Sequence, residues 1–382
     1  MAHTEATEAG AAKKNPRAFK HAVGTPAATR LGQELKRVYS CFDAAGFVRE
    51  AQRGLPALEL KPRIRFLCDA MARRLPADYP SALRIVLDTL GPELAQGEPV
   101  GSNAFYYWVH GNFVEVYGLG HMAESLAAMR AITKRSTSEF AVRPFLAQDL
   151  SAVLDYLHDC ADDESPHVRR WVSEGTRPFL PWGRRVPALL KEPTLGLGLL
   201  EKLRHDPSPY VRTSLANHLN DVSKLRPELA VDTIQAWTKA HVPEVGWLAK
   251  RALRGLVKAG YPAALSVFGA RANTRAELTS LRLRKARINV GEHLEFELTV
   301  TGAANEQLLV DYALSFPGAA GRTSRKVFKL ASKSVKKGEL LSMRKRHSFR
   351  PITTRVYRAG KHTVEILVNG KVLGSVQFSL VL

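Results

Sequence analysis

The sequence has few cysteines and no long apolar run, and each shortage excludes a class of protein. Its three cysteines, Cys41, Cys68 and Cys160, are an odd number and widely separated, which favours reduced thiols over a disulfide framework. No stretch approaches the roughly 18 uninterrupted apolar residues of a membrane helix, so we expect no membrane partner. The first residues contain no apolar core of the signal-peptide kind, which predicts a cytoplasmic protein.

Motifs for metals and phosphate loops are also missing. The 12 histidines show neither HExxH nor HxH spacing, and no Gly-rich phosphate loop stands out. We therefore predict no metal and no cofactor.

Acidic residues are scarce relative to basic ones. The chain carries 56 Lys and Arg against 36 Asp and Glu, a formal net charge of +20. Such an excess favours a polyanionic partner, because Lys and Arg neutralise phosphates and release counterions. Nucleic acid is the predicted partner, and a basic surface without any partner is the alternative.

The hydrophobic period divides the chain into regions. Residues 1–31 lack periodicity and predict a flexible N-terminal tail. Over 32–270, apolar residues recur at spacings of three and four, as they do in helices. From 277 to 382 the period is two, with about seven strands and a hairpin turn at Asn369–Gly370. The predicted fold is mainly α, a HEAT-like helical-repeat solenoid followed by a small all-β immunoglobulin-like sandwich.

Positive charge is concentrated in the strand region. Residues 277–382 hold 19 Lys and Arg against 8 Asp and Glu, a net charge of +11. This placement predicts a domain that grips nucleic acid. A solvated basic sandwich without a nucleic-acid role remains the alternative.

The helical region contains an internal repeat. A motif of Ser, Pro, Val and Arg occurs twice, 43 residues apart: Ser165, Pro166, Val168 and Arg169 return as Ser208, Pro209, Val211 and Arg212. A weaker third copy places Pro243 and Val245 a further 34 residues on. Paired helices at such periods, with Pro opening the second helix, are typical of HEAT-like solenoids.

Alignment of the copies predicts a polar stripe along one wall of the repeats. Its members in the three copies are Arg170, Glu174 and Arg177; Thr213, Asn217 and Asn220 with Asp221 beside them; and Trp247, Arg251 and Arg254. Each alone has an ordinary explanation, such as a salt-bridged helix face or a helix cap. Acids on an arginine-rich wall favour a chemical role, because isolated carboxylates weaken binding to phosphates.

Three segments resemble the AlkC/AlkD superfamily of HEAT-like DNA alkylation-repair glycosylases. They are TSEFAVRPFL (137–146), SPHVRRWVSEGTRPFLPWG (165–183) and HDPSPYVRTSLANHLND (205–221). The resemblance is closest to the AlkC branch, some of whose members append an immunoglobulin-like domain. It covers about residues 100–260 well and 32–99 more loosely.

The resemblance implies a DNA glycosylase of base excision repair. Such an enzyme hydrolyses the N-glycosidic bond of cationic N-alkylated bases, such as 3-methyladenine and 3-methylcytosine, without deep base flipping. By resemblance, Glu139, Glu174 and Asp221 are the catalytic acids that stabilise an oxocarbenium-like sugar and position water. The residues alone point independently to Glu174 and Asp221, whereas Glu139 rests on the resemblance.

The expected DNA-binding residues lie on or near the same wall. They are Arg143, Arg170, Arg177, Trp182, Arg212, Asn217, Asn220, Trp247 and Arg251. The expected partner is double-stranded DNA that contains alkylated bases, bound by a monomer associated with the nucleoid. The competing interpretation is a non-catalytic HEAT-repeat scaffold that binds nucleic acid without any reaction.

Overall fold

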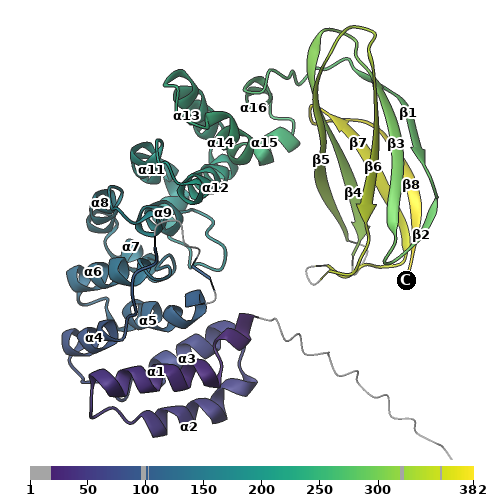
Figure 1. Ribbon diagram of the computed structural model, residues 1–382. Coiled ribbons are helices and arrows are strands. Elements are labelled where there is room, and N and C mark those ends of the chain that lie inside the picture. The colour runs from purple at the N-terminus through teal and green to yellow at the C-terminus, as the bar shows by residue number, and fades with distance from the viewer. Residues whose placement is uncertain (1–18, 96–99, 102, 319–321, 353–354) are drawn as a thin grey trace, which may run out of the picture. The chain divides into compact units, whose positions relative to one another are not determined.

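The computed structural model describes residues 19–95, 100–101, 103–318, 322–352 and 355–382, with helices preceding strands along the chain (Figure 1). The chain divides into two compact units, Met1–His218 and Leu219–Leu382. The boundary falls inside one helix, so the second unit holds the last helices as well as the strands. None of the helices in the described part of the chain is both long and apolar enough to cross a membrane.

Stacked helices form the first unit. They are η1 (Phe19–Ala22), α1 (Thr25–Val38), α2 (Ala44–Gly54), η2 (Leu55–Ala57), α3 (Leu60–Ala72), α4 (Tyr79–Asp88), α5 (Asn103–Tyr117), α6 (Met122–Thr133), α7 (Val142–Gln148), α8 (Leu150–Cys160), α9 (Pro166–Gly175), α10 (Pro187–Lys191), η3 (Pro193–Gly196), α11 (Leu197–Leu203) and α12 (Pro209–Leu225), the last of which continues into the second unit. The helices predicted from the apolar spacing are confirmed.

The predicted N-terminal tail is too long. Residues 1–18 lie outside the described residues, but 19–31 contain η1 and the first half of α1. Pro26 stands in the first turn of α1, where a missing N–H costs nothing. Ala28, Leu31 and Leu35 are buried, so α1 is held by an apolar face that the Ala- and Thr-rich composition concealed.

Both copies of the Ser-Pro-Val-Arg motif build the same local structure. Pro166 and Pro209 begin α9 and α12, as the repeat predicted. Nη1 of Arg169 donates to the backbone carbonyls of residues 163 and 164 at 2.8 and 2.9 Å. Nη1 of Arg212 makes the equivalent contacts with residues 206 and 207 at 3.0 and 2.7 Å. The motif arginine therefore closes the loop before its own helix.

Ion pairs join successive repeats in the first unit. Arg130 on α6 pairs with Asp163 before α9, and Arg169 on α9 pairs with Asp206 before α12, at 2.5 and 2.6 Å. Both aspartates also accept the backbone N–H two residues on, at 2.8 Å. We call these two ion pairs the repeat ladder. Each aspartate orders the entry to its helix and ties it to the preceding repeat.

The second unit continues the helices and then changes to strands. Its later helices are α13 (Pro227–Lys239), α14 (Val245–Ala252), α15 (Arg254–Lys258) and α16 (Pro262–Ser266). The weak third copy departs from the first two, because α14 begins only at Val245, after Glu244 in a left-handed conformation with φ of 57°. The change of period predicted after residue 276 coincides with the first strand.

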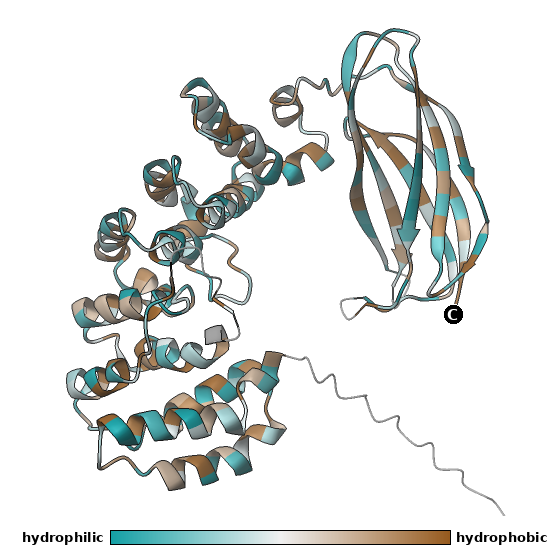
Figure 2. Cartoon of the chain, in the orientation of Figure 1, coloured by the Kyte–Doolittle hydropathy of each residue, from teal (hydrophilic) through white to brown (hydrophobic). Residues whose placement is uncertain are grey.

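Two sheets form the immunoglobulin-like sandwich. One has the order β1-β3-β6 and the other β2-β8-β7-β4-β5. The strands are β1 (Glu277–Leu283), β2 (Arg287–Asn289), β3 (His293–Thr301), β4 (Glu306–Pro317), β5 (Thr323–Val335), β6 (Leu340–Ser348), β7 (Gly360–Val368) and β8 (Lys371–Val381). In β3, Leu294, Phe296, Leu298 and Val300 are buried in alternation, and Figure 2 shows such bands along the strands. The predicted sandwich is confirmed, with eight strands in the described residues where about seven were expected.

The predicted hairpin at Asn369–Gly370 joins β7 to β8. Both residues have positive φ, 49° and 81°, as a two-residue turn of this sequence requires. A Cβ on Gly370 would lie 2.2 Å from the Cα of Gly260, so only glycine fits. Asn369 accepts the N–H of Leu309 and donates to the carbonyl of Arg271, each at 2.8 Å. The hairpin therefore ties the sandwich to the last helical turns of the second unit.

Candidate active site

Two of the predicted acids lie around a single guanidinium in the first unit. Arg170 on α9 pairs with Glu139, which stands in the turn before α7, and with Glu174 one helical turn further along α9. Nη2 of Arg170 lies 3.6 Å from Oε1 of Glu174. Arg177 completes the group, since its Nη1 donates to the same oxygen at 2.5 Å. We call Glu139, Arg170, Glu174 and Arg177 the carboxylate cluster.

Both oxygens of Glu174 have hydrogen-bond donors. Oε1 receives Arg177, and Oε2 accepts a hydrogen bond from the hydroxyl of Ser214 on α12 at 2.6 Å. The hydroxyl of Ser173 donates in turn to Ser214 at 2.5 Å. This network fixes the orientation of the carboxylate.

The surroundings keep Glu174 ionised. Its side chain is nearly buried, and burial alone would raise its pKa, but Arg170, Arg177 and the Ser214 hydrogen bond hold the pKa below its usual range. Burial likewise acts to lower the pKa of Arg170, and the two carboxylates outweigh this and raise it. Glu174 and Arg170 are therefore both charged at neutral pH.

The cluster opens onto an aromatic cavity of about 340 Å³. Glu139 and Glu174 line it together with the rings of Phe105, Trp108, Phe140 and Trp182. Trp108 and Phe140 stack with their centroids 4.7 Å apart. Two carboxyl groups thus face a space walled by rings.

Trp182 stands at the edge of this cavity in an unusual conformation. Its side chain is 57% exposed, and its φ of 63° lies in the left-handed region that a bulky residue rarely adopts. Lys61 donates to its carbonyl. Such strain at an exposed aromatic residue is typical of functional sites.

Arg143 holds the loop that carries Trp182. Its guanidinium is fully buried and donates to the carbonyls of Gly175, Arg177 and Arg184 at 2.7 to 2.8 Å. This placement gives Arg143 a structural role instead of the direct DNA contact predicted from the sequence.

Other predicted DNA-binding residues of the first unit are also engaged within the protein. Arg177 is buried against Glu174, so it orients the acid and offers little surface to a phosphate. Arg212 closes its own loop through two carbonyls. Asn217 lies half-buried on α12. Of the predicted set in this unit, Trp182 lines the cavity, and Arg170 pairs with the two acids that line it.

The second unit contains the remaining predicted residues. Asp221 is buried and pairs with Lys224 at 2.9 Å. Asn220 donates to the carbonyl of Ala252 at 2.8 Å, an internal bond that replaces the predicted DNA contact. Arg251 lies over the half-exposed ring of Trp247 at 5.8 Å, so that both side chains face the surface. The catalytic role of Asp221 stays a prediction.

Several residues at the cavity were not found from the sequence. Phe140 directly follows Glu139, and Trp108 lies in an aromatic-rich stretch, so composition held a weak signal for both. Tyr210, whose ring lies 5.3 Å from the guanidinium carbon of Arg170, and Ser214 lie one repeat away, where only the folded structure brings them close. Within the described residues, no three His, Cys, Asp or Glu side chains are grouped to hold a metal ion.

Comparison with known proteins places the chain in a family. Residues 277–382 match the family model described as the C-terminal Ig-like domain of the uncharacterised protein YhaZ. YhaZ of Bacillus subtilis strain 168 is 38% identical over 325 residues, which are 85% of this chain and 88% of that protein. The solved structure of the Pseudomonas fluorescens alkylpurine DNA glycosylase AlkC, bound to DNA containing an abasic site analog, is also similar. It aligns with a TM-score of 0.86 at 34% identity over 95% of this chain and 99% of that one. The chain therefore belongs to the AlkC/AlkD superfamily, in the AlkC branch that carries a C-terminal immunoglobulin-like domain.

Proposed function

We propose that the protein is a DNA glycosylase that hydrolyses the N-glycosidic bond of cationic N-alkylated bases without deep base flipping. The observation that carries this proposal is the pairing of Glu139 and Glu174 around Arg170 at an aromatic cavity, in a chain of net charge +20. A protein that only binds phosphates gains nothing from carboxylates that line a cavity. The similarity to an AlkC glycosylase solved with DNA supports the same conclusion.

The chemistry suits acids that stay ionised. Alkylation at N3 or N7 leaves the base cationic, so it departs without being protonated. The remaining work is to stabilise an oxocarbenium-like sugar and to position a water molecule, which carboxylates aimed at C1′ perform. Glu139 and Glu174 take these roles, and Asp221 is the third acid that the sequence predicts.

The rings around the cavity favour a cationic base. The faces of Trp108, Phe140 and Trp182 carry the negative side of an aromatic quadrupole, which attracts positive charge. A base such as 3-methyladenine or 3-methylcytosine carries that charge before it leaves. The cavity therefore favours alkylated over unmodified bases while its acids favour the departing sugar cation.

The sandwich supplies a second part of the proposal. Its net charge of +11 includes many exposed lysines and arginines, and we propose that they neutralise DNA phosphates.

The direct test incubates the purified protein with methylated duplex DNA and identifies released bases by chromatography. We expect release of 3-methyladenine and 3-methylcytosine, in proportions that the experiment determines. Binding of the duplex without release of any base would instead support the non-catalytic scaffold.

A further inference from the structure

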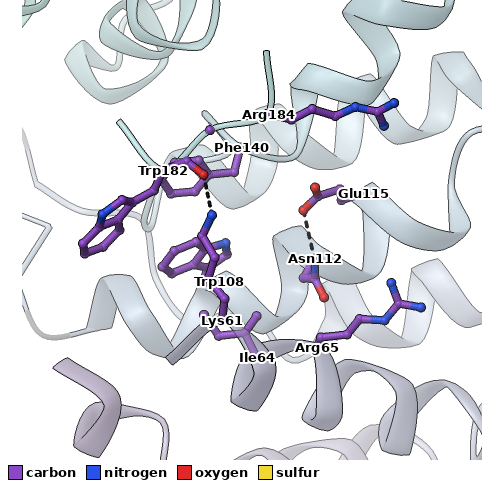
Figure 3. Close-up of a pocket in the computed structure, with 10 residues that line it drawn as sticks. Lys61, Ile64, Arg65, Trp108, Asn112, Glu115, Phe140, Trp182 and Arg184 are labelled. Atoms are coloured by element: carbon purple, nitrogen blue, oxygen red, sulfur yellow. Dashed lines mark hydrogen bonds between the residues drawn. The ribbon is translucent and has the colours of Figure 1, made fainter. Parts of the chain in front are cut away.

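A second cavity in the first unit shares its aromatic wall with the carboxylate cavity (Figure 3). Its volume is about 480 Å³, and Trp108, Phe140 and Trp182 line both cavities. The acids of the carboxylate cluster do not line it. It contains instead Asn112 and Glu115, one turn apart on α5, which the proposed reaction does not use.

Asn112 and Glu115 present hydrogen-bond acceptors to this cavity. Nδ2 of Asn112 donates to Oε2 of Glu115 at 3.0 Å, as Figure 3 shows. Oδ1 of Asn112 is buried and has no hydrogen-bond partner within the part of the chain that the structure describes. A buried acceptor without a donor is costly, so the site favours a ligand that brings N–H groups. Burial raises the pKa of Glu115, against the effect of Asn112 and of nearby Lys61, Arg184 and Arg65.

Cations accompany these acceptors. Lys61, Arg65 and Arg184 line the same cavity and are exposed to solvent. Nε of Arg65 donates to both carboxylate oxygens of Asp69 at 2.8 Å. In Figure 3 the guanidinium of Arg65 extends beyond Asn112. The side chain of Arg184 projects from the loop that Arg143 holds. Positive charge at the mouth and acceptors within suit a ligand with an anionic group and a polar N–H edge.

A nucleotide has this combination of groups. Its base stacks on aromatic rings, an interaction that tolerates any sequence. Its phosphate meets Lys and Arg. The cavity volume lies within the range of roughly 300 to 1,000 Å³ of small-ligand sites. Among the bases, guanine offers adjacent N1–H and N2–H donors that match the two oxygens of a carboxylate, whereas thymine offers a single N–H.

We propose that this cavity holds an undamaged nucleotide of the bound DNA, unstacked from its neighbours, with guanine preferred. The base lies against the wall of Trp108 and Trp182, and its Watson–Crick edge meets Glu115 and Asn112. Its phosphate lies at the mouth, near Arg65 and Arg184. That the nucleotide belongs to bound DNA rests on the proposed function. That the ligand is a nucleotide rests on the residues of the cavity alone.

The first experiment tests the cavity without DNA. Calorimetric titration of the full chain compares dGMP, dTMP and deoxyribose 5-phosphate. We expect dGMP to bind best, and Glu115→Gln to weaken dGMP roughly 10-fold or more while the other two ligands change less than about twofold. Unchanged binding of dTMP shows that the variant is folded. Glu164→Gln, at an exposed acid outside the cavity, is the matched control and should bind dGMP like the wild type. Equal affinity for dGMP and deoxyribose 5-phosphate, or no effect of Glu115→Gln on dGMP, would overturn the proposal.

The second experiment identifies the source of the nucleotide. Guanines around an abasic-site analogue in a duplex are replaced one at a time by hypoxanthine, which lacks the N2 amino group. We expect one position where this change weakens binding to the wild type but not to Glu115→Gln. If dGMP binding depends on Glu115 but no position in the duplex is sensitive, the DNA source is wrong. If the protein fails to bind duplex DNA at all, the proposed function is wrong. The titration with dGMP still tests whether the cavity binds a nucleotide.

Discussion

Helix α9 carries two neighbouring arginines with different surroundings. Arg169 belongs to the repeat ladder, where it joins Asp206 and two backbone carbonyls and closes a loop. Arg170 belongs to the carboxylate cluster, where it joins Glu139 and Glu174 beside a cavity. The residues of the ladder line neither of the two cavities described above. The comparison shows that an ion pair indicates chemistry only when its groups also face a volume that a substrate can enter.

The strongest contrast between the two regions should appear in catalysis. Glu174→Gln removes the charge that stabilises the sugar cation, so the single-turnover rate of base excision per folded molecule should fall by ~100-fold or more. DNA affinity should change little, because Glu174 is nearly buried. Asp206→Asn, a change of the same kind in the ladder, is the control and should retain the rate. An equal loss of excision rate in both variants would show that the carboxylate cluster matters no more for catalysis than the repeat ladder.

A variant of Asp221 tests whether this residue acts in catalysis, like the carboxylate cluster, or in structure, like the repeat ladder. Asp221→Asn should also lower the excision rate by ~100-fold if it acts as the third catalytic acid. A normal rate with a lowered melting temperature would assign Asp221, buried and paired with Lys224, to structure.

The ladder should dominate stability. Asp206→Ala leaves Arg169 without its partner and removes the acceptor for the N–H of Ser208. Breaking a buried ion pair in this way typically costs about 3 kcal/mol, which chemical denaturation would measure. The excision rate per folded molecule should stay near the wild-type value. A normal unfolding free energy would show that the ladder is dispensable.

The exposed lysines and arginines of the sandwich should act differently from both the repeat ladder and the carboxylate cluster. Replacing Lys333, Lys336 and Lys337 with Gln removes three exposed charges. Because each phosphate contact contributes about 0.9 to the slope of log affinity against log salt, the slope should shrink by up to ~3. Binding titrations at several salt concentrations measure this slope. An unchanged slope would make this part of the sandwich a stability or interaction module.

Arg170 should be sensitive to geometry as well as charge. Arg170→Lys keeps a cation but loses the fork that reaches two carboxylates, so DNA binding should change within a few-fold while excision falls roughly 10-fold. The pKa of Glu174 should rise toward its usual range, and the acid limb of the rate profile should move to higher pH. Single-turnover rates over a range of pH measure both effects. A wild-type profile would show that the fork of Arg170 is not needed for excision.

The smallest expected effect is that of pH on the wild type. The folded-state pKa of Glu174 is lowered, so its stabilising contribution is present above the unfolded value of about 4.3 and is lost as pH falls through the folded value. Glu174 should therefore stay ionised from about pH 5 to 8, and the excision rate should be nearly constant over that range. A fall in rate that begins near neutral pH, with no change in DNA binding, would contradict an ionised Glu174.

Local patterns accounted for much of the fold. The spacing of apolar residues predicted the helices and strands, and the repeated prolines predicted where α9 and α12 begin. The start of α1 was missed because Ala and Thr reveal little periodicity, although Leu31 and Leu35 are buried.

The candidate site was predictable only in part. The i, i+4 and i+7 spacing placed Arg170, Glu174 and Arg177 together, but it could not show that Arg177 lies beyond the end of α9 and is buried, or that Arg143 bonds three carbonyls. Resemblance supplied Glu139. The contact of Ser214 with Glu174, 40 residues away, depends on how two repeats pack, which a pattern within one helix does not encode.

In the proposed reaction Glu139 and Glu174 act as one catalytic unit through Arg170, and a double-mutant cycle of excision rates tests this coupling. Single-turnover rates are measured for the wild type, Glu139→Gln, Glu174→Gln and the double variant. If either acid is lost, Arg170 turns to the other and neutralises it. The double variant should therefore be slower than the slower single variant by less than about 10-fold. Two losses that multiply, to roughly 10⁴-fold from two of ~100-fold, would show independent acids and contradict the shared site.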